Sequence, residues 1–105
     1  MDPFQIKKIR GAMITTEHTR ITKEDIPSLT FHNELDIDQD ENIMSQLETA
    51  TRLGNGYHSK VNIYFVADQG PKSVTTTIWA TGTKYICLKG GVWLPICRIE
   101  HIESD

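Results

Sequence analysis

Residues 74–102 read VTTTIWATGTKYICLKGGVWLPICRIEHI, and this stretch decides the fold. Along it, apolar and polar residues alternate between short turns that contain glycine. This is the pattern of β-strands that bury one face. The stretch therefore predicts consecutive antiparallel strands.

The loop Lys89-Gly90-Gly91 sets the register of one hairpin. A two-residue turn at the glycines would divide the aliphatic residues between the two faces of the sheet. A three-residue loop with Gly91 in a left-handed conformation keeps them on one face. It predicts the pairs Leu88 with Val92, Ile86 with Leu94, and Lys84 with Ile96.

The same requirement, that the apolar residues lie on one face of the sheet, determines the register at two further turns. A loop at Thr81-Gly82-Thr83 predicts the pairs Ala80 with Lys84, Ile78 with Ile86, and Thr76 with Leu88. A tight turn at residues 68–71, after a strand at residues 60–67, predicts the pairs Phe65 with Val74, Ile63 with Thr76, and Val61 with Ile78. After Pro95 we expect a short helical turn and a last strand at residues 98–102.

A helix is predicted before these strands, over about residues 40–53. Four small or apolar residues, Ile43, Leu47, Ala50 and Gly54, recur at helical spacing, and Gly54 is expected to end the helix. Asp38 with Glu41 resembles a capping box at its start. The fold class is therefore mainly β (α+β): one helix, then a strongly bent five-stranded antiparallel sheet or small open barrel at about residues 60–103.

The predicted core is the inner face of that sheet, closed by two helix residues. Its members share the face defined by the three turns: Val61, Ile63, Phe65, Val74, Ile78, Ile86, Leu88, Val92, Leu94, Ile96 and Ile99, with Leu47 and Ala50 from the helix.

Residues 1–39 are predicted to form an N-terminal arm, apart from a domain at residues 40–105. Residues 1–27 carry apolar residues without a regular period and are expected to be irregular, with a single helical turn beginning at Thr22. From Leu29 to Ile37 apolar residues fall mostly on odd positions, which indicates an extended segment packed on the rest.

Composition limits the class of protein. Residues 1–59 hold six Lys and Arg against ten Asp and Glu, while residues 60–105 hold five against four, so the net charge is −3. This balance is unlike that of proteins that depend on phosphate contacts.

The cysteines Cys87 and Cys97 lie too far apart in the predicted register for a disulfide, so we expect free thiols. With no run of transmembrane length and no apolar leader, a cytoplasmic protein is expected.

The segment LPICRIEHI resembles the closing pattern of Sm-like small β-barrels, in which an aliphatic-Pro-Ile turn precedes Arg-Ile and a final strand. The resemblance covers about residues 42–103 and implies a small barrel that binds single-stranded RNA or DNA. Sm-like RNA binders carry an acidic residue and an asparagine in one turn and Arg-Gly in another. Here those turns read Thr81-Gly82-Thr83 and Pro95-Ile96-Cys97-Arg98, so only Arg98 matches.

The sequence contains none of the motifs that mark common enzymes, such as a nucleophile elbow, HExxH or a phosphate-binding glycine loop. We therefore expect no enzyme and no cofactor. Asp36, Asp38 and Asp40 begin like a calcium-binding loop, but Glu41 and Leu47 stand where that loop needs glycine and glutamate. Cys97 and His101 lack the further ligands of a zinc site. We therefore expect no metal.

The leading functional hypothesis is a non-enzymatic adaptor or regulatory module that binds another protein. Its partner-binding residues are predicted to be Trp79, Tyr85 and Trp93 on the outer face of the sheet, with Lys60 and Arg98 as charged neighbours. The alternative is single-stranded RNA or DNA binding, with Tyr64, Trp79, Tyr85 and Trp93 as stacking platforms. No membrane partner is expected, and the chain is expected to be a monomer or weak homo-oligomer.

Two alternatives remain for these aromatic residues. The helix or the segment 29–37 covers them and makes a second core, or they stay exposed and form a binding surface.

Overall fold

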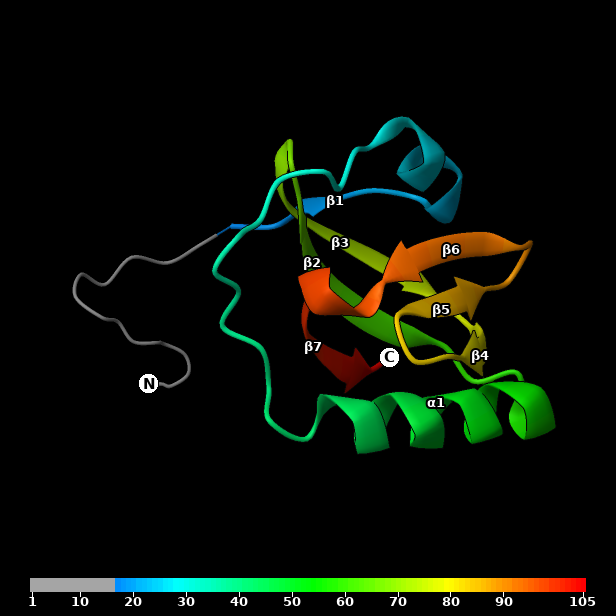
Figure 1. Cartoon of the computed structure of the whole chain (residues 1–105). Coiled ribbons are helices and arrows are strands. Elements are labelled where there is room, and N and C mark those ends of the chain that lie inside the picture. Colours follow the sequence, from blue (N-terminus) through cyan, green and yellow to red (C-terminus); the bar gives the residue numbers. More distant parts are fainter. Residues whose placement is uncertain (1–16) are drawn as a thin grey trace.

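The computed structural model describes residues 17–105 and has an α+β fold built from two open sheets and one α-helix (Figure 1). Predictions that concern residues 1–16 lie outside the described residues. Within residues 17–105, no helix has both the length and the apolar character needed to cross a membrane.

The first sheet has four strands in the order β1-β3-β2-β7. Its strands are β1 (Thr19–Arg20), β2 (Val61–Ala67), β3 (Gly70–Thr76) and β7 (Ile99–Ser104). The strands β2, β3 and β7 are antiparallel neighbours, whereas β1 runs parallel to β3. The first strand after the helix, β2, is therefore paired with the last strand, β7, which lies at one edge of the sheet.

The second sheet has three antiparallel strands: β4 (Ile78–Thr81), β5 (Tyr85–Leu88) and β6 (Val92–Pro95). A 3-10 turn, η2 (Ile96–Arg98), leads from β6 into β7, in agreement with the helical turn expected after Pro95. Only Thr77 separates β3 from β4, and its carbonyl accepts a hydrogen bond from the Lys89 N–H at 2.9 Å. One bent segment thus passes from one sheet to the other.

The prediction of five strands in one sheet is wrong. The described residues form seven strands in two sheets, because the expected second strand divides at Thr77 and because Thr19–Arg20 adds a short parallel strand. The break at Thr77 has a physical reason: a strand that continued straight could not pair with β2 along its first part and with β5 along its second.

The predicted register is confirmed for the β5–β6 hairpin and is wrong for the β2–β3 and β4–β5 hairpins. Leu88 pairs with Val92 and Ile86 with Leu94, as the three-residue loop required. The two-residue turn between β2 and β3 lies one residue earlier than predicted, at Asp68 and Gln69, so Ile63 pairs with Val74 instead of Thr76. A slip of two residues keeps every side chain on its face, which is why the same residues are buried.

Between β4 and β5 the register is also different. Ile78 pairs with Leu88 and Ala80 with Cys87, with an irregularity between Ile78 and Ala80. The predicted pair of Ile78 with Ile86 assumed a regular ladder, whereas a bulge inserts one extra residue.

The helix α1 (Ile43–Tyr57) begins later and ends later than predicted. Gly54 does not end it but lies inside it, buried against β4, where an added Cβ would stand 2.7 Å from the Ile78 carbonyl oxygen. The helix ends at His58, which has a left-handed φ of 58° and donates its N–H to the Gly54 carbonyl. The N-cap is Asn42, and its side chain makes no capping hydrogen bond.

The core lies between the two sheets and α1, which contacts β4 and β7 (Figure 1). Every predicted core residue is buried except Val92, which packs against the core and is only partly buried. The core also contains three residues outside the predicted list: Ile26, Ile43 and Ala67. Ile26 comes from the 3-10 helix η1 (Lys23–Ser28), so part of the N-terminal region belongs to the core.

The segment from Leu29 to Ile37 was predicted to be extended and packed. It contains no strand, although Leu29 and Phe31 pack partly against the core while Leu35 is exposed. Asp68 holds this segment, because its carboxylate accepts hydrogen bonds from the Thr30 hydroxyl and the His32 N–H.

Candidate partner-binding surface

Three large aromatic side chains are exposed on the second sheet, and we call Trp79, Tyr85 and Trp93 the aromatic face. Their exposed fractions are 46%, 49% and 58%. Side chains of this size normally bury most of their area in a folded protein.

The β5–β6 hairpin places two of these residues by simple alternation. Tyr85 pairs with Pro95 and Cys87 pairs with Trp93, so these four side chains share the outer face of the hairpin. The residues between them, Ile86 and Leu94, point inward and are fully buried. The inward residues therefore hold the hairpin on the core and orient the aromatic rings outward.

The third aromatic residue, Trp79, lies at the bulge of β4. Because the register shifts between Ile78 and Ala80, Trp79 and Ala80 together stand opposite Cys87, and both are exposed. The backbone here is also tied to α1, since the Asn55 side-chain amide donates to the Trp79 carbonyl at 3.3 Å. This contact fixes the edge of the aromatic face relative to the helix.

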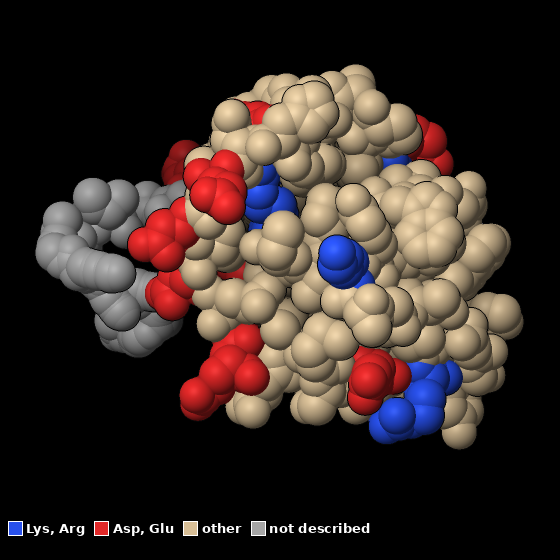
Figure 2. Space-filling model, viewed as in Figure 1, with Lys and Arg blue, Asp and Glu red and all other residues tan. Residues whose placement is uncertain are grey.

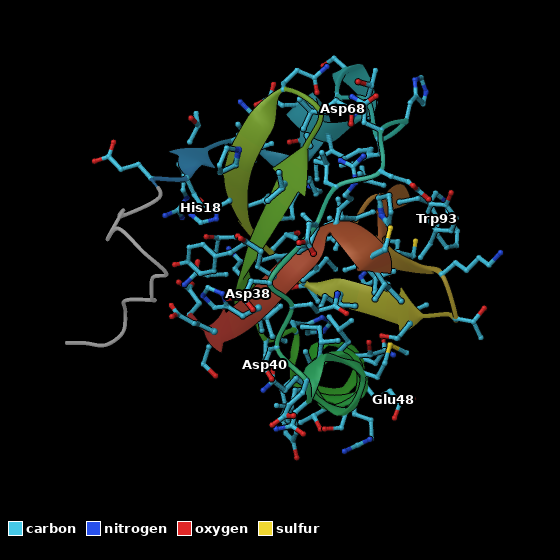
Figure 3. The ribbon with its side chains drawn as sticks, turned by 60° about the vertical axis from the view of Figure 1, so that its left-hand side comes forward. His18, Asp38, Asp40, Glu48, Asp68 and Trp93 are labelled. Atoms are coloured by element: carbon cyan, nitrogen blue, oxygen red, sulfur yellow. The ribbon has the colours of Figure 1, made fainter. Side chains whose placement is uncertain are left out.

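Neither the helix nor the segment 29–37 forms a cover over the aromatic face. The exposed fractions of all three residues exclude a second core, which was one of the two alternatives drawn from the sequence. Trp93 points away from the body of the protein, on the side opposite His18 (Figure 3).

The charged neighbours differ from those expected. Lys84 and Lys89 are exposed in the loops that flank β5. Lys60 is exposed, but it stands before a β2 strand whose register begins with Val61 opposite Thr76, so it does not pair with Trp79. Acidic side chains gather mainly at the left of the space-filling view, while its broad centre is mostly uncharged (Figure 2).

Arg98 is not part of the surface, because only 3% of it is exposed. Its guanidinium donates to the carbonyls of Val66 and Asn33 and to the Asp68 carboxylate, the last at 2.8 Å. It also lies 5.6 Å from the centre of the Phe31 ring. Arg98 therefore holds the 29–37 segment against β2 from inside.

This ion pair changes the chemistry of Asp68. The Arg98 guanidinium, with the His32 N–H and the Thr30 hydroxyl, holds the pKa of the Asp68 carboxyl far below its usual range. No local sequence pattern indicates this pairing, since the two residues are thirty positions apart.

A second cluster of titratable residues, also missed in the sequence, lies on β2 and β7. The His18 ring donates to the Glu100 carboxylate at 2.6 Å, and the ring of Tyr64 stacks on His101 with centroids 4.5 Å apart. Burial, together with the nearby Glu103 carboxylate, raises the pKa of Tyr64. Among residues 17–105, no group of His, Cys, Asp and Glu side chains is arranged to hold a metal ion.

The described part of the chain thus defines a small α+β domain of two open sheets with an exposed aromatic face. Both cysteines are free, as expected. No protein-family model matches the sequence, and no curated protein or solved structure shows significant similarity to it.

Proposed function

We propose that this protein is a non-enzymatic adaptor or regulatory module that binds another protein through the aromatic face. One observation carries the proposal: Trp79, Tyr85 and Trp93 are about half exposed on one small sheet. Covering such rings removes a large apolar area from water, and Trp and Tyr are enriched among the residues that dominate binding energy.

The surroundings of the aromatic face are suited to a protein partner. Interfaces commonly have an apolar centre and a polar rim. Here the exposed Lys84 and Lys89 flank β5, while the partly buried Cys87 and Pro95 lie between the rings. An extended or helical segment with apolar side chains and acidic flanks would match this arrangement.

Single-stranded RNA or DNA is the second candidate. It is favoured by the same exposed rings, which are able to stack on bases, and by the resemblance of residues 42–103 to Sm-like barrels. The net charge of −3 opposes it, because backbone phosphates need a concentrated basic surface.

The test is a pull-down with three tagged proteins from nuclease-treated extracts. The wild type and a Leu35→Ser control should recover the same specific protein, while Trp93→Ser should lose it. Leu35 is a matched control because it is an exposed apolar residue, 42% exposed, outside the aromatic face.

Two further outcomes decide between the candidates. Loss of all capture after nuclease treatment, together with binding of random single-stranded RNA at low salt, would replace the protein partner with nucleic acid. Equal capture by Trp93→Ser and wild type would remove the aromatic face from the proposal.

A further inference from the structure

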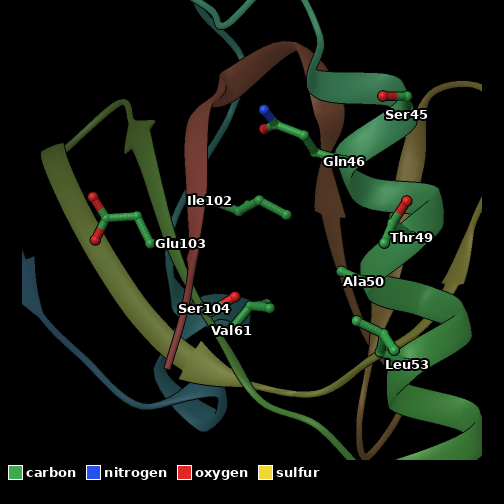
Figure 4. A pocket seen from close by; sticks show the side chains of 9 residues that line it. All are labelled: Ser45, Gln46, Thr49, Ala50, Leu53, Val61, Ile102, Glu103 and Ser104. Atoms are coloured by element: carbon green, nitrogen blue, oxygen red, sulfur yellow. The ribbon is translucent and has the colours of Figure 1, made fainter.

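A groove lies between α1 and the strands β2 and β7, at a distance in the fold from the outer face of β4–β6. The groove is open to solvent and has a volume of about 260 Å³. Gln46, Thr49, Ala50 and Leu53 line it from the helix, and Val61 and Ile102 line it from the sheet (Figure 4). This volume is just below the range of about 300 to 1,000 Å³ that is typical of small-molecule sites.

Gln46 brings a buried acceptor without a partner to this groove. Its side-chain NH₂ donates to the Asp40 carboxylate at 3.3 Å. A carboxylate only accepts hydrogen bonds, so the orientation of the amide is fixed and its oxygen must lie on the other side. That Oε1 atom is buried and has no hydrogen-bond partner.

Figure 4 shows the Gln46 oxygen on the side of its amide that is nearer Ile102. Buried acceptors without partners are rare in folded proteins, and a ligand or ordered water commonly accounts for them. The oxygen has almost no accessible surface, so a donor in the groove would satisfy it after a small rotation of the Gln46 side chain.

The remaining walls define what else the ligand must be. An aliphatic surface is supplied by Ala50, Leu53, Val61 and Ile102, and Leu53 is 43% exposed. No basic residue lines the groove, and Glu103 is the acidic residue in its wall. An anionic ligand would therefore be disfavoured.

We propose that this groove binds a small aliphatic molecule that carries an N–H donor, either an uncharged amide or an amine. The N–H group donates to Gln46 Oε1, and the aliphatic chain covers Leu53 and Ile102. This site is independent of the aromatic face and of the partner proposed for it.

Three probes of equal length test the chemistry: pentanamide, pentylamine and pentanoate. Each is titrated into the full ¹⁵N-labelled chain while backbone and side-chain amide resonances are followed by NMR. Pentanamide or pentylamine should give saturable shifts at Ala50, Leu53 and Ile102 and at the Gln46 side-chain amide. Pentanoate should give none at the same concentrations.

Two variants test the residues. Gln46→Met keeps the length of the side chain but removes the acceptor, and it should weaken binding of the N–H probe by about tenfold. Glu48→Met makes a comparable change on the exposed part of the same helix and should leave binding unchanged. Leu53→Ser, at a partly exposed position, should also weaken binding and serves if Gln46→Met fails to fold.

Three results would overturn the inference. The first is the absence of saturable shifts with both N–H probes, as expected for a groove that holds only water. The second is equal binding of pentanoate. The third is unchanged affinity in a folded Gln46→Met or Leu53→Ser variant.

Discussion

At the scale of single residues, the two glycines of α1 have opposite roles. Gly54 lies where a Cβ would approach the Ile78 carbonyl oxygen at 2.7 Å and the Thr77 methyl at 2.8 Å, whereas Gly56 has no heavy atom within 4 Å of that position. Only Gly54 is therefore required for the helix to lie close to β4. Gly56 weakens the helix without any compensating contact.

Gly54→Ala should lower the free energy of unfolding by about 1 to 3 kcal/mol, because a backbone must move to admit the new methyl group. Gly56→Ala should raise it by about 0.4 to 1 kcal/mol, because alanine restricts the unfolded chain and favours the helix. Urea denaturation of the two variants measures both effects. A stabilised Gly54→Ala protein would show that the helix does not approach β4 this closely.

Asp68 provides a prediction that depends on pH. Its folded-state pKa lies below the unfolded value of about 3.9, mainly because of Arg98, so its ionised form stabilises the fold. This contribution is fully present above about pH 4 and is lost as the pH falls through the lower, folded-state pKa.

Asp68→Asn should therefore be less stable than wild type at neutral pH, because Arg98 loses its ion-pair partner while it remains buried. The difference in denaturation midpoint between the two proteins should shrink as the pH falls below about 4. Thermal unfolding between neutral and strongly acidic pH measures it. A difference that is constant over that range would mean that Asp68 is not held in its ionised form by the fold.

The site residues show where reasoning from single positions fails. Trp79, Tyr85 and Trp93 were placed outward correctly, because the alternation in a strand survives any slip by two residues. Arg98 was predicted to be a charged neighbour of these aromatic residues, yet it is the last residue of the 3-10 turn η2 and its side chain is buried. Its partners Val66 and Asn33 are distant in sequence, so no local pattern announces them.

At the scale of elements, the β5–β6 hairpin is the best-determined part of the fold. Ile86 and Leu88 are fully buried on its inner face. Replacing either with alanine should lower the free energy of unfolding by roughly 2 to 5 kcal/mol, through lost burial and the cavity that remains.

Chemical denaturation of Ile86→Ala and Leu88→Ala checks this expectation, with Lys84→Ala as the exposed control in the neighbouring loop. If both core variants unfold at the wild-type midpoint, the inner and outer faces of the hairpin have been exchanged.

The elements were predictable to different extents for physical reasons. The glycines of the Lys89-Gly90-Gly91 loop have positive φ angles of 90° and 83°, so this turn had a clear chemical signature. No such signature marks the turn at Asp68 and Gln69 or the bulge at Trp79. Burial of one face determines which residues point inward, but it does not determine which residue on the neighbouring strand each of them pairs with. Gly54 misled the assignment of the helix end because glycine also serves close packing.

At the scale of the whole molecule, the exposure of the aromatic face has an optical consequence. Trp79 and Trp93 are the only two tryptophans of the sequence, and their exposed fractions are 46% and 58%. Tryptophan emission of the free protein should therefore lie toward the red and should be quenched by both iodide and acrylamide.

A Trp79→Phe variant isolates the emission of Trp93 and should be quenched at least as strongly as wild type. Blue-shifted emission that resists both quenchers would mean that the aromatic face is covered in solution, either by the chain itself or by a second copy. Sedimentation velocity separates these two explanations.

The division into two sheets could not be read from the sequence. Residues 74–81 read VTTTIWAT, and Thr77 is only the last of three consecutive threonines, so it carries no signal for a change of sheet. The strand β1 is only two residues long and pairs in parallel with Lys72 and Ser73, more than fifty positions away. Such pairings depend on the assembled fold and leave no local pattern.

The pairing of β2 with β7 also has a consequence during synthesis of the chain. Val61 pairs with Ser104, and the Asp105 N–H donates to the Lys60 carbonyl at 3.4 Å. The strand β2 therefore cannot form these hydrogen bonds until β7 has been synthesised. While the ribosome still holds residues 99–104 in its exit tunnel, β2 has an unpaired edge and the inner face near Ile63 and Phe65 lacks Ile99. The nascent chain is then open to premature association until β7 has left the tunnel and pairs with β2.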